Sequence, residues 1–403
     1  MTPPTQPIAL PKPAPIIDQF VIDSDVVFLN HGSFGACPKA VLDAQSAHRL
    51  AAERELVRFY LHDAWGKIDR SRNALASVVG CASEDLVFVH NATTGVATVL
   101  DNIKLSAGDE LLITNCEYPA CINNFNRTAQ RTGAKVVVAD LPWPIESEDQ
   151  VFDAIVSKAT DRTRYVLLSL ITSSTGIRLP IERLIAEFKA RGIETILDAA
   201  HGCGCVPVEI DNWGAAYTTG NAHKWLCAPK GAAFLHVRKD LQKGFTPLIV
   251  SINGNNLEEA AERTGRSPFN QAFDYVGTDD VSAYLTIADA IEWLESTMEG
   301  GINGLMKRNH ELCIRARNLI CEAMDCTPPV PDSMLGPLST IDIPAGSKTA
   351  AEVKDRLESE YKIQIPIWGT PAGTIAVRIS PQAYNSIEQY EYLASALKYI
   401  LES

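Results

Sequence analysis

One lysine in this sequence has neighbours that suggest chemistry. Lys224 lies between His223 and Trp225 in the run GNAHKWL (220–226), and a Pro-Lys-Gly turn and an apolar run follow it. Such neighbours partly remove the amine from water, which lowers its pKa and makes it a nucleophile toward an aldehyde. The sequence therefore predicts Schiff-base chemistry at Lys224.

A carboxylate at the end of an apolar run is the second such feature. Asp198 directly follows residues 194–197, which are typical of a buried strand, and His201 comes shortly after it. A buried carboxylate needs a charged partner, and a cationic ring nitrogen in a cofactor would be one. The residues alone leave a second interpretation open, in which this aspartate caps the following turn.

A run rich in hydroxyl groups is the third feature. Residues 91–95 (NATTG) lie between a predicted strand at 86–90 and a predicted helix. Hydroxyl groups and free backbone N–H groups at a helix N-terminus bind phosphate well. Thr93 or Thr94 can equally be a helix cap, so this motif gains weight only beside the lysine and the carboxylate.

All three features follow strands of a segment in which strands and helices alternate. Seven candidate strands are predicted at 86–90, 111–114, 135–139, 164–168, 194–198, 215–219 and 232–237. Helical patterns fall between several of them, at 94–103, 119–131, 149–159 and 180–191. Such alternation predicts an α/β fold with a mostly parallel sheet, and open sheets of this kind bind their ligands at the strand ends.

The chain is expected to divide into three parts. A Pro-rich arm (1–25) should not form a helix, and it runs either as an extended strap over a surface or a partner subunit or as a loose tail. The large α/β domain (26–280) begins with helical patterns at 38–61 and 65–79 and ends in an irregular connection at 265–278. The small α+β domain (281–403) has helical patterns at 281–298, 302–324, 347–360 and 387–401 and strands at 339–343 and 374–379.

Composition narrows the class of protein. The 403 residues are 46% hydrophobic and 21% charged, which is typical of a folded globular protein. The net charge of −13 disfavours a nucleic-acid partner. The sequence has no GxGxxG, GxxxxGK[ST], HExxH or GxSxG motif, so nicotinamide and nucleotide-triphosphate enzymes lose support.

The ten cysteines indicate a compartment rather than a metal centre. No CxxC pair occurs, and the single CxC pair, Cys203 and Cys205, is interpreted as two buried thiols, so no metal site is expected. Free thiols in a long apolar chain fit a reducing, cytoplasmic setting. The Pro-rich start lacks the apolar core of a secretory signal, and no apolar run reaches membrane-spanning length, so no membrane partner is expected.

Taken together, the phosphate-type turn, the strand-end aspartate and the His-Lys pair resemble the fold-type I pyridoxal phosphate enzymes, specifically the class V aminotransferase superfamily. Three runs resemble its isopenicillin N epimerase-like branch: FLNHGSFGA (28–36), GNAHKWL (220–226) and VRISPQAYN (377–385). The resemblance covers nearly the whole chain. It implies a seven-stranded, mostly parallel sheet and pyridoxal 5'-phosphate as the cofactor.

The resemblance also assigns residues to roles at the cofactor. Lys224 matches the lysine that forms the Schiff base and moves the Cα proton, and Asp198 matches the partner of the pyridinium nitrogen, which keeps the ring an electron sink. With His201 these are the expected catalytic residues. The remaining cofactor contacts are expected from Thr93, Thr94, Asn221 and His223 at the phosphate, from Ser173 and His201 near the phenolic oxygen, and from Tyr118 on the ring face.

Two further sets of residues match substrate and subunit contacts of the family. Arg378 resembles the arginine that binds the substrate carboxylate, although a surface salt bridge is the other interpretation. Asn30 and His31 match a loop over the substrate entrance, or else form a turn with an asparagine cap. Gly277 and Thr278 resemble a loop that reaches the phosphate in the neighbouring subunit, which implies a homodimer with shared sites.

Three reactions on an amino acid or small peptide-like substrate stay open. Epimerisation, which the branch name carries, needs a second acid/base opposite Lys224, from among Tyr118, Tyr60, His62 and Tyr384. C–S β-lysis of a cysteine conjugate or sulfoxide needs only the lysine and a departing sulfur. Transamination needs a keto acid that enters the same pocket.

The sequence disfavours two other hypotheses, a cysteine desulfurase and a non-catalytic protein. Cysteine desulfurases of this superfamily carry a cysteine on a loop before the carboxylate-binding arginine, and residues 363–376 contain none. A binding or regulatory protein on a degenerate scaffold would ordinarily have lost Asp198, Lys224 or Arg378, and all three are present.

Overall fold

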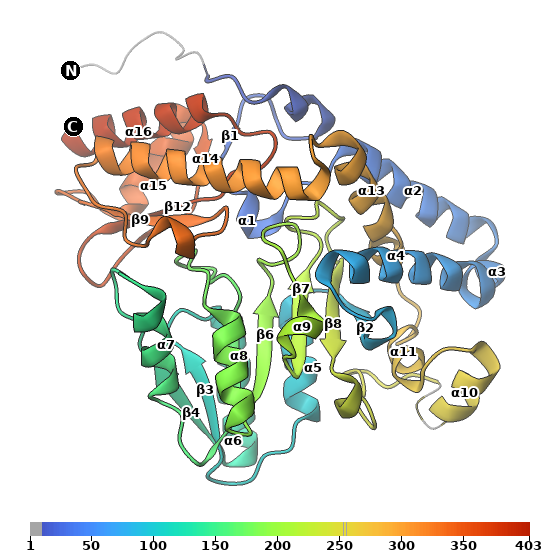
Figure 1. The fold of residues 1–403 in the computed structure, drawn as a ribbon. Coiled ribbons are helices and arrows are strands. Elements are labelled where there is room, and N and C mark those ends of the chain that lie inside the picture. Colours follow the sequence, from blue (N-terminus) through green and yellow to red (C-terminus); the bar gives the residue numbers. More distant parts are fainter. Residues whose placement is uncertain (1–9, 253, 255) are drawn as a thin grey trace.

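The computed structural model describes residues 10–252, 254 and 256–403, and a seven-stranded sheet lies at its centre (Figure 1). Its strands are β2 (Leu86–Val89), β3 (Glu110–Thr114), β4 (Lys135–Ala139), β5 (Thr163–Ser169), β6 (Glu194–Ala199), β7 (Tyr217–Asn221) and β8 (Ala233–Val237). They lie in the order β2-β8-β7-β6-β5-β3-β4, and β8 alone runs antiparallel to its neighbours. The predicted α/β class with a mostly parallel sheet is confirmed.

Helices cover this sheet on both faces (Figure 1). They are α5 (Ala92–Asn102), α6 (Pro119–Thr132), α7 (Glu148–Val156), α8 (Ile181–Ala190) and α9 (Ile210–Trp213). Leu111 and Ile113 belong to the apolar cluster that contains α5 and α6, whereas Leu112 between them belongs to the cluster that contains α8. Because successive strand residues point to opposite faces, Leu111–Ile113 of β3 fill apolar clusters on both sides of the sheet.

The N-terminal third adds helices beside the sheet. The predicted helical patterns are observed as α2 (Lys39–Arg54), α3 (Leu56–Arg58), the π-helical turn η2 (Phe59–Asp63) and α4 (Ala64–Val79). A short helix, α1 (His31–Phe34), and the 3-10 turn η3 (Ser83–Asp85) complete this part. The final turn of α4 ends at Gly80, whose φ of 66° is the left-handed conformation that glycine favours.

A second, antiparallel sheet of three strands lies in the C-terminal part, in the order β11-β12-β9. Its strands are β9 (Ser339–Ile343), β11 (Ile367–Gly369) and β12 (Ile375–Ile379). The helices of this part are α12 (Ser282–Leu285), α13 (Ile287–Thr297), α14 (Gly301–Ala323), α15 (Ala350–Tyr361) and α16 (Ile387–Glu402), with a 3-10 turn, η5 (Asp332–Met334). The predicted strands and helices beyond residue 280 therefore occur close to their expected positions.

The N-terminal segment joins this C-terminal part. Strand β1 (Val27–Phe28) pairs in parallel with β10 (Ile363–Gln364), and Val27 and Leu29 belong to the same apolar cluster as α14 and α16. Helix α13 packs both against α14 and against the N-terminal helices α2 and α4. The boundaries predicted at residues 25 and 280 stay a prediction.

Three local predictions differ from the structure. The arm is extended where the structure describes it, except that Pro15–Gln19 forms a 3-10 helix (η1), which Pro15 permits because proline is compatible with the first turn of a helix. Its first nine residues lie outside the described part. The connection predicted as irregular contains α11 (Pro268–Phe273), and α10 (Leu257–Thr264) and η4 (Lys239–Leu241) precede it. Strand β7 begins and ends two residues later than predicted, so Asn221 is its last residue.

Among the residues that the structure describes, none of the helices combines the length and apolar character needed to span a membrane.

Candidate active site

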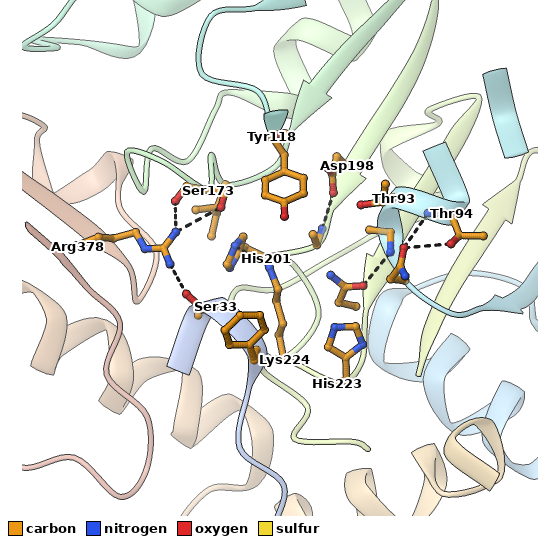
Figure 2. Close-up of a pocket in the computed structure, with 18 residues that line it drawn as sticks. Ser33, Thr93, Thr94, Tyr118, Ser173, Asp198, His201, His223, Lys224 and Arg378 are labelled. Carbon is orange, nitrogen blue, oxygen red and sulfur yellow. Dashed lines mark hydrogen bonds between the residues drawn. The ribbon is translucent and has the colours of Figure 1, made fainter. Parts of the chain in front are cut away.

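A cavity of about 580 Å³ opens where the parallel strands end (Figure 2). Segments that follow β2, β3, β5, β6 and β7 form most of its wall, and α1 and β12 close it. Ten of the residues predicted to act line it together: Thr93, Thr94, Tyr118, Ser173, Asp198, His201, Asn221, His223, Lys224 and Arg378. The topology thus brings together side chains that lie up to 285 positions apart in sequence, from Thr93 to Arg378.

The lysine amine is held by a histidine. Lys224 Nζ lies 3.0 Å from His201 Nε2, and the indole N–H of Trp225 donates to His201 Nδ1 at 3.1 Å. Burial lowers the pKa of His201 well below 6.5, with the positive charge of Lys224 adding to the effect. The ring is therefore neutral with its proton on Nε2, so it donates toward the amine.

Burial also lowers the pKa of Lys224 to about 8, and the nearby Asp198 carboxylate opposes part of that shift. About a tenth of the amine is therefore unprotonated at pH 7, far more than for an ordinary lysine, and this is the form that attacks a carbonyl or accepts a proton. This agrees with the desolvated lysine that the sequence predicted.

Two carboxyl groups are buried at this end of the sheet: Asp198 lines the cavity, and Glu117 lies behind its wall. Asp198 accepts a hydrogen bond from the Ala200 N–H at 2.9 Å and one from the Cys121 thiol at 3.5 Å, and burial raises its pKa. Glu117 accepts from the hydroxyl groups of Ser169 at 2.5 Å and Thr114 at 2.9 Å, and burial raises its pKa to about 7. Sequence reasoning missed Glu117, although it lies shortly after the end of β3 and Asp198 lies at the end of β6.

The phosphate-type turn is a capped helix N-terminus. Asn91 Oδ1 accepts from the backbone N–H of Thr94 at 2.8 Å, and Asn221 Oδ1 accepts from the N–H of Ala92 at 2.9 Å. A Cβ on Gly95 would lie 2.1 Å from Thr219 Oγ1, so only glycine lets α5 begin this close to β7. Two strand-end segments therefore fix the direction of the helix. Of its first four N–H groups, those of Ala92, Thr94 and Gly95 are bonded within the fold, so an anion at this N-terminus would bind the Thr93 N–H and the hydroxyl groups of Thr93 and Thr94.

His223 lies beside this helix start. Its Nδ1 donates to the carbonyl of Ala232 at 3.0 Å, and burial lowers its pKa to about 4. The ring is therefore neutral in this structure, and Nε2 carries a lone pair. A phosphate beside Nε2 would favour the protonated ring, because a nearby negative charge stabilises the cationic form, and Nε2–H would then donate to it.

Arg378, on β12, enters from the C-terminal part. Its guanidinium donates to the Ser173 carbonyl at 2.6 Å and to Ser33 Oγ at 2.8 Å, while Nε is buried without a partner among the described residues. Burial lowers its pKa to about 10, which still leaves the group charged at neutral pH. A buried cation with an unused donor fits a carboxylate ligand.

The turn of α1 differs from expectation. His31 is fully buried and does not line the cavity, because its ring bonds to the Lys224 carbonyl at 2.9 Å and to the Tyr384 hydroxyl at 2.9 Å. The predicted place of His31 over the substrate entrance is therefore wrong, because its side chain is buried and contacts other parts of the fold. Tyr384, one of the four residues proposed as a second acid/base, is also buried. Asn30 contacts the next turn through Ser33, whose hydroxyl donates to its Oδ1 at 2.6 Å. Ser33 and Phe34, which sequence reasoning missed, line the cavity instead.

The remaining candidates lie outside this cavity. Gly277 lines a separate apolar cavity, and Thr278 adjoins it, so their predicted reach into a partner's site stays a prediction. Tyr60 donates to the Asp279 carbonyl at 3.1 Å, and His62 is exposed. Of the four proposed second acid/bases, Tyr118 alone lines the cavity among the described residues.

Comparison with known proteins identifies the family. The aminotransferase class-V family matches residues 36–393. The chain belongs to this family. The class V aminotransferase superfamily predicted from the sequence is thereby confirmed, and membership makes the chain an enzyme that depends on pyridoxal phosphate.

The relatives of this class V enzyme are named for different activities. It is 30% identical to a probable L-cysteine desulfhydrase, chloroplastic, of Arabidopsis thaliana, over 93% of this chain and 83% of that protein. It is 29% identical to the isopenicillin N epimerase of Streptomyces clavuligerus, over 94% and 96%. A solved structure of a C-DES mutant with glycine covalently linked to its PLP cofactor has the same fold, with a TM-score of 0.79 at 20% identity over 95% of this chain and 98% of that one.

The cavity fits this cofactor chemically. The positive end of helix α5, with the hydroxyl groups of Thr93 and Thr94, suits a phosphate, the buried Asp198 carboxylate suits a ring N–H, and the amine of Lys224 suits an aldehyde. Each of these groups is buried or fixed by hydrogen bonds, and the unpartnered Arg378 Nε leaves a cation for a substrate carboxylate.

Proposed function

We propose that this enzyme is a carbon–sulfur β-lyase that acts on a cysteine-type amino acid. The observation that carries the proposal is the pair formed by Lys224 and His201, which supplies one amine poised to take a proton. β-Elimination needs one acid/base and a departing sulfur, so this pair suffices. The relative of Arabidopsis thaliana described above, with its desulfhydrase name, supports the same reaction class.

The proposal gives each group at the cofactor one task. Bound pyridoxal phosphate supplies an electron sink that acidifies the substrate Cα–H. Lys224 would hold it, with Asp198 at the ring nitrogen, His201 and Ser173 near the phenolic oxygen, and Tyr118 against the ring. Thr93, Thr94, Asn221 and His223 would bind its phosphate.

Arg378 would bind the substrate carboxylate and so present the Cα–H bond toward Lys224. Neutral Lys224 takes this proton on its lone pair, and His201, which lies 3.0 Å from the amine in this structure, would give up its hydrogen bond to the amine when the proton arrives. As the Cβ–S bond breaks, its electron pair leaves with sulfur, and Lys224 returns the proton to the thiolate. The released 2-aminoacrylate adds water and yields pyruvate and ammonia, so no oxidant is consumed.

Epimerisation is the second candidate, because one observation favours it. Tyr118 and Lys224 enter the cavity from opposite sides in Figure 2, and Tyr118 is 45% exposed. A tyrosine hydroxyl on the side away from the lysine is the second acid/base that inversion at Cα requires.

One incubation distinguishes the two reactions. The holoenzyme is mixed in deuterated water with L-cysteine, S-alkyl-L-cysteines and L-alanine, and pyruvate, thiol, Cα deuterium and chirality are followed together. A C–S lyase releases pyruvate and thiol in equal amounts, and the variant Tyr118→Phe retains this activity. Deuterium incorporation with loss of chirality, no pyruvate and dependence on Tyr118 would instead establish epimerisation.

A further inference from the structure

A large aromatic side chain stands exposed at the mouth of the cavity that holds the charged groups of the site. Phe34 is 71% exposed and lines the cavity with Lys224 and Arg378. Single exposed apolar residues are ordinary on protein surfaces, but this one adjoins the groups that would bind an amino acid. A ligand that covers Phe34 would remove apolar surface from water.

The position of Phe34 is fixed by the backbone on both sides. His31 Nε2 bonds to the Lys224 carbonyl at 2.9 Å, and Lys230 Nζ donates to the Gly35 carbonyl at 2.6 Å. Gly35 has a φ of 71°, and a Cβ there would lie 2.1 Å from the His223 carbonyl oxygen. The turn therefore sits directly on the segment that carries the lysine, and these contacts hold the backbone of Phe34 beside the cavity.

The residue before Phe34 contacts the predicted carboxylate site. Ser33 Oγ accepts a hydrogen bond from Arg378 at 2.8 Å. If an amino acid binds with its carboxylate at Arg378 and its Cα near Lys224, its side chain must lie in the remaining part of the cavity. Asp198 and the capped start of α5 make the inner wall polar, whereas Phe34 offers an apolar surface at the open side.

We propose that Phe34 is a specificity-determining residue that packs against an apolar substituent on the substrate side chain. In combination with the proposed lyase reaction, on which the sulfur chemistry rests, the preferred substrates are S-alkyl and S-aryl conjugates of L-cysteine rather than free cysteine. The side-chain preference itself is a property of binding and can be measured without any sulfur.

The first test compares two substrates in matched variants of the holoenzyme. Phe34→Ala lowers kcat/KM for S-benzyl-L-cysteine by roughly tenfold, mainly through KM, and changes kcat/KM for L-cysteine by less than about twofold. Phe34→Leu retains most of the preference because it keeps an apolar side chain. Tyr399→Ala, which removes an exposed aromatic ring from α16, controls for loss of surface aromatic area. Equal losses for both substrates in Phe34→Ala would overturn the inference.

The second test separates this inference from the proposed reaction. Calorimetry measures binding of L-phenylalanine and L-alanine, which have no leaving group, to the holoenzyme and to Phe34→Ala. We expect the wild type to favour L-phenylalanine by roughly tenfold and the variant to lose that preference. If this holds while no conjugate releases thiol, the lyase proposal fails and the role of Phe34 stands.

The third measurement tests a competing explanation, in which a second copy of the chain covers Phe34. Sedimentation of wild type and Phe34→Ala gives the same oligomeric state if the side chain faces substrate. A shift toward smaller species, together with an unchanged preference between the two amino acids, would assign Phe34 to a subunit contact and overturn the inference.

Discussion

The inner wall and the mouth of the cavity are built in different ways. The inner wall comes from consecutive strand ends of one sheet, and its Asp198 and His201 are buried and bonded to near neighbours. The mouth combines α1, near the N-terminus, with Arg378 on β12, and it exposes Phe34. Groups for bond-breaking thus lie in the rigid sheet edge, whereas groups that would recognise the substrate come from segments distant in sequence.

This difference predicts that substitutions on the inner wall act on the chemical step and those at the mouth act on substrate binding. Relatives with different names but a shared family are consistent with such a division, because a common set of strand-end residues can serve several reactions.

The largest effect is expected at the amine of the inner wall. Lys224→Ala removes both the predicted cofactor attachment and the proton acceptor, so product formation falls by roughly 1,000-fold or more. Borohydride treatment followed by mass spectrometry shows cofactor fixed to the wild type and none fixed to the variant. The exposed Lys398→Ala serves as the control, and cofactor trapped equally in Lys224→Ala would refute the assignment.

The next largest effect is expected at the cation of the mouth. Arg378→Lys retains the charge but loses the fork that holds Ser173 and Ser33, and kcat/KM for an amino acid falls by roughly 100-fold, mostly in KM. Steady-state kinetics on the lysine variant and on the surface change Arg356→Lys test this. A fall in kcat alone would place Arg378 with the inner wall instead.

Behind the inner wall, Glu117 predicts a dependence of stability on pH. Burial raises its pKa from 4.5 to about 7, so folding disfavours the ionised form, and wild-type stability falls as the pH rises through this window. Glu117→Gln lacks that loss, so its melting temperature relative to wild type should be a few degrees higher at pH 8 than at pH 5. Calorimetry measures the melting temperatures of wild type and variant at both pH values. The variant Glu258→Gln, which removes an exposed carboxylate from α10, controls for the loss of one negative charge. An equal difference at both pH values contradicts the assigned shift.

The smallest effect is expected at Ser33. Ser33→Ala removes one hydrogen bond to Arg378 and should raise KM by roughly fivefold with kcat unchanged. Comparing the double variant Ser33→Ala/Arg378→Lys with the two single variants measures how strongly these residues are coupled. Fully additive effects would show that Ser33 does not act through Arg378.

Most of the inner wall could be predicted from the sequence because its signals are local. Asp198 lies at the end of β6 and the Lys224 run begins at the end of β7, and parallel strands end at one edge, so their meeting follows from the fold class. Glu117 carried the same signal, a carboxylate after a strand, and a uniform search of strand ends would have found it.

The mouth could not be predicted in the same way. His31 and Phe34 lie three residues apart in one motif, yet one is buried and the other exposed. What buries His31 is Tyr384 and the Lys224 carbonyl, which are far away in sequence. No local pattern records which residue of such a turn meets a distant chain segment, and Ser33 was missed for the same reason.

The pairing of β1 with β10 has a consequence for how the protein is made. Strand β1 (Val27–Phe28) is synthesised early, but its partner β10 (Ile363–Gln364) is synthesised near the end of the chain, and Arg378 is synthesised after that partner. A nascent chain emerges from the ribosome N-terminus first. The seven-stranded sheet can therefore form before Arg378, which completes the mouth of the cavity, has been synthesised. A ribosome-bound chain can therefore form the inner wall of the cavity, with Lys224, early, whereas the substrate site is complete only when synthesis is almost finished.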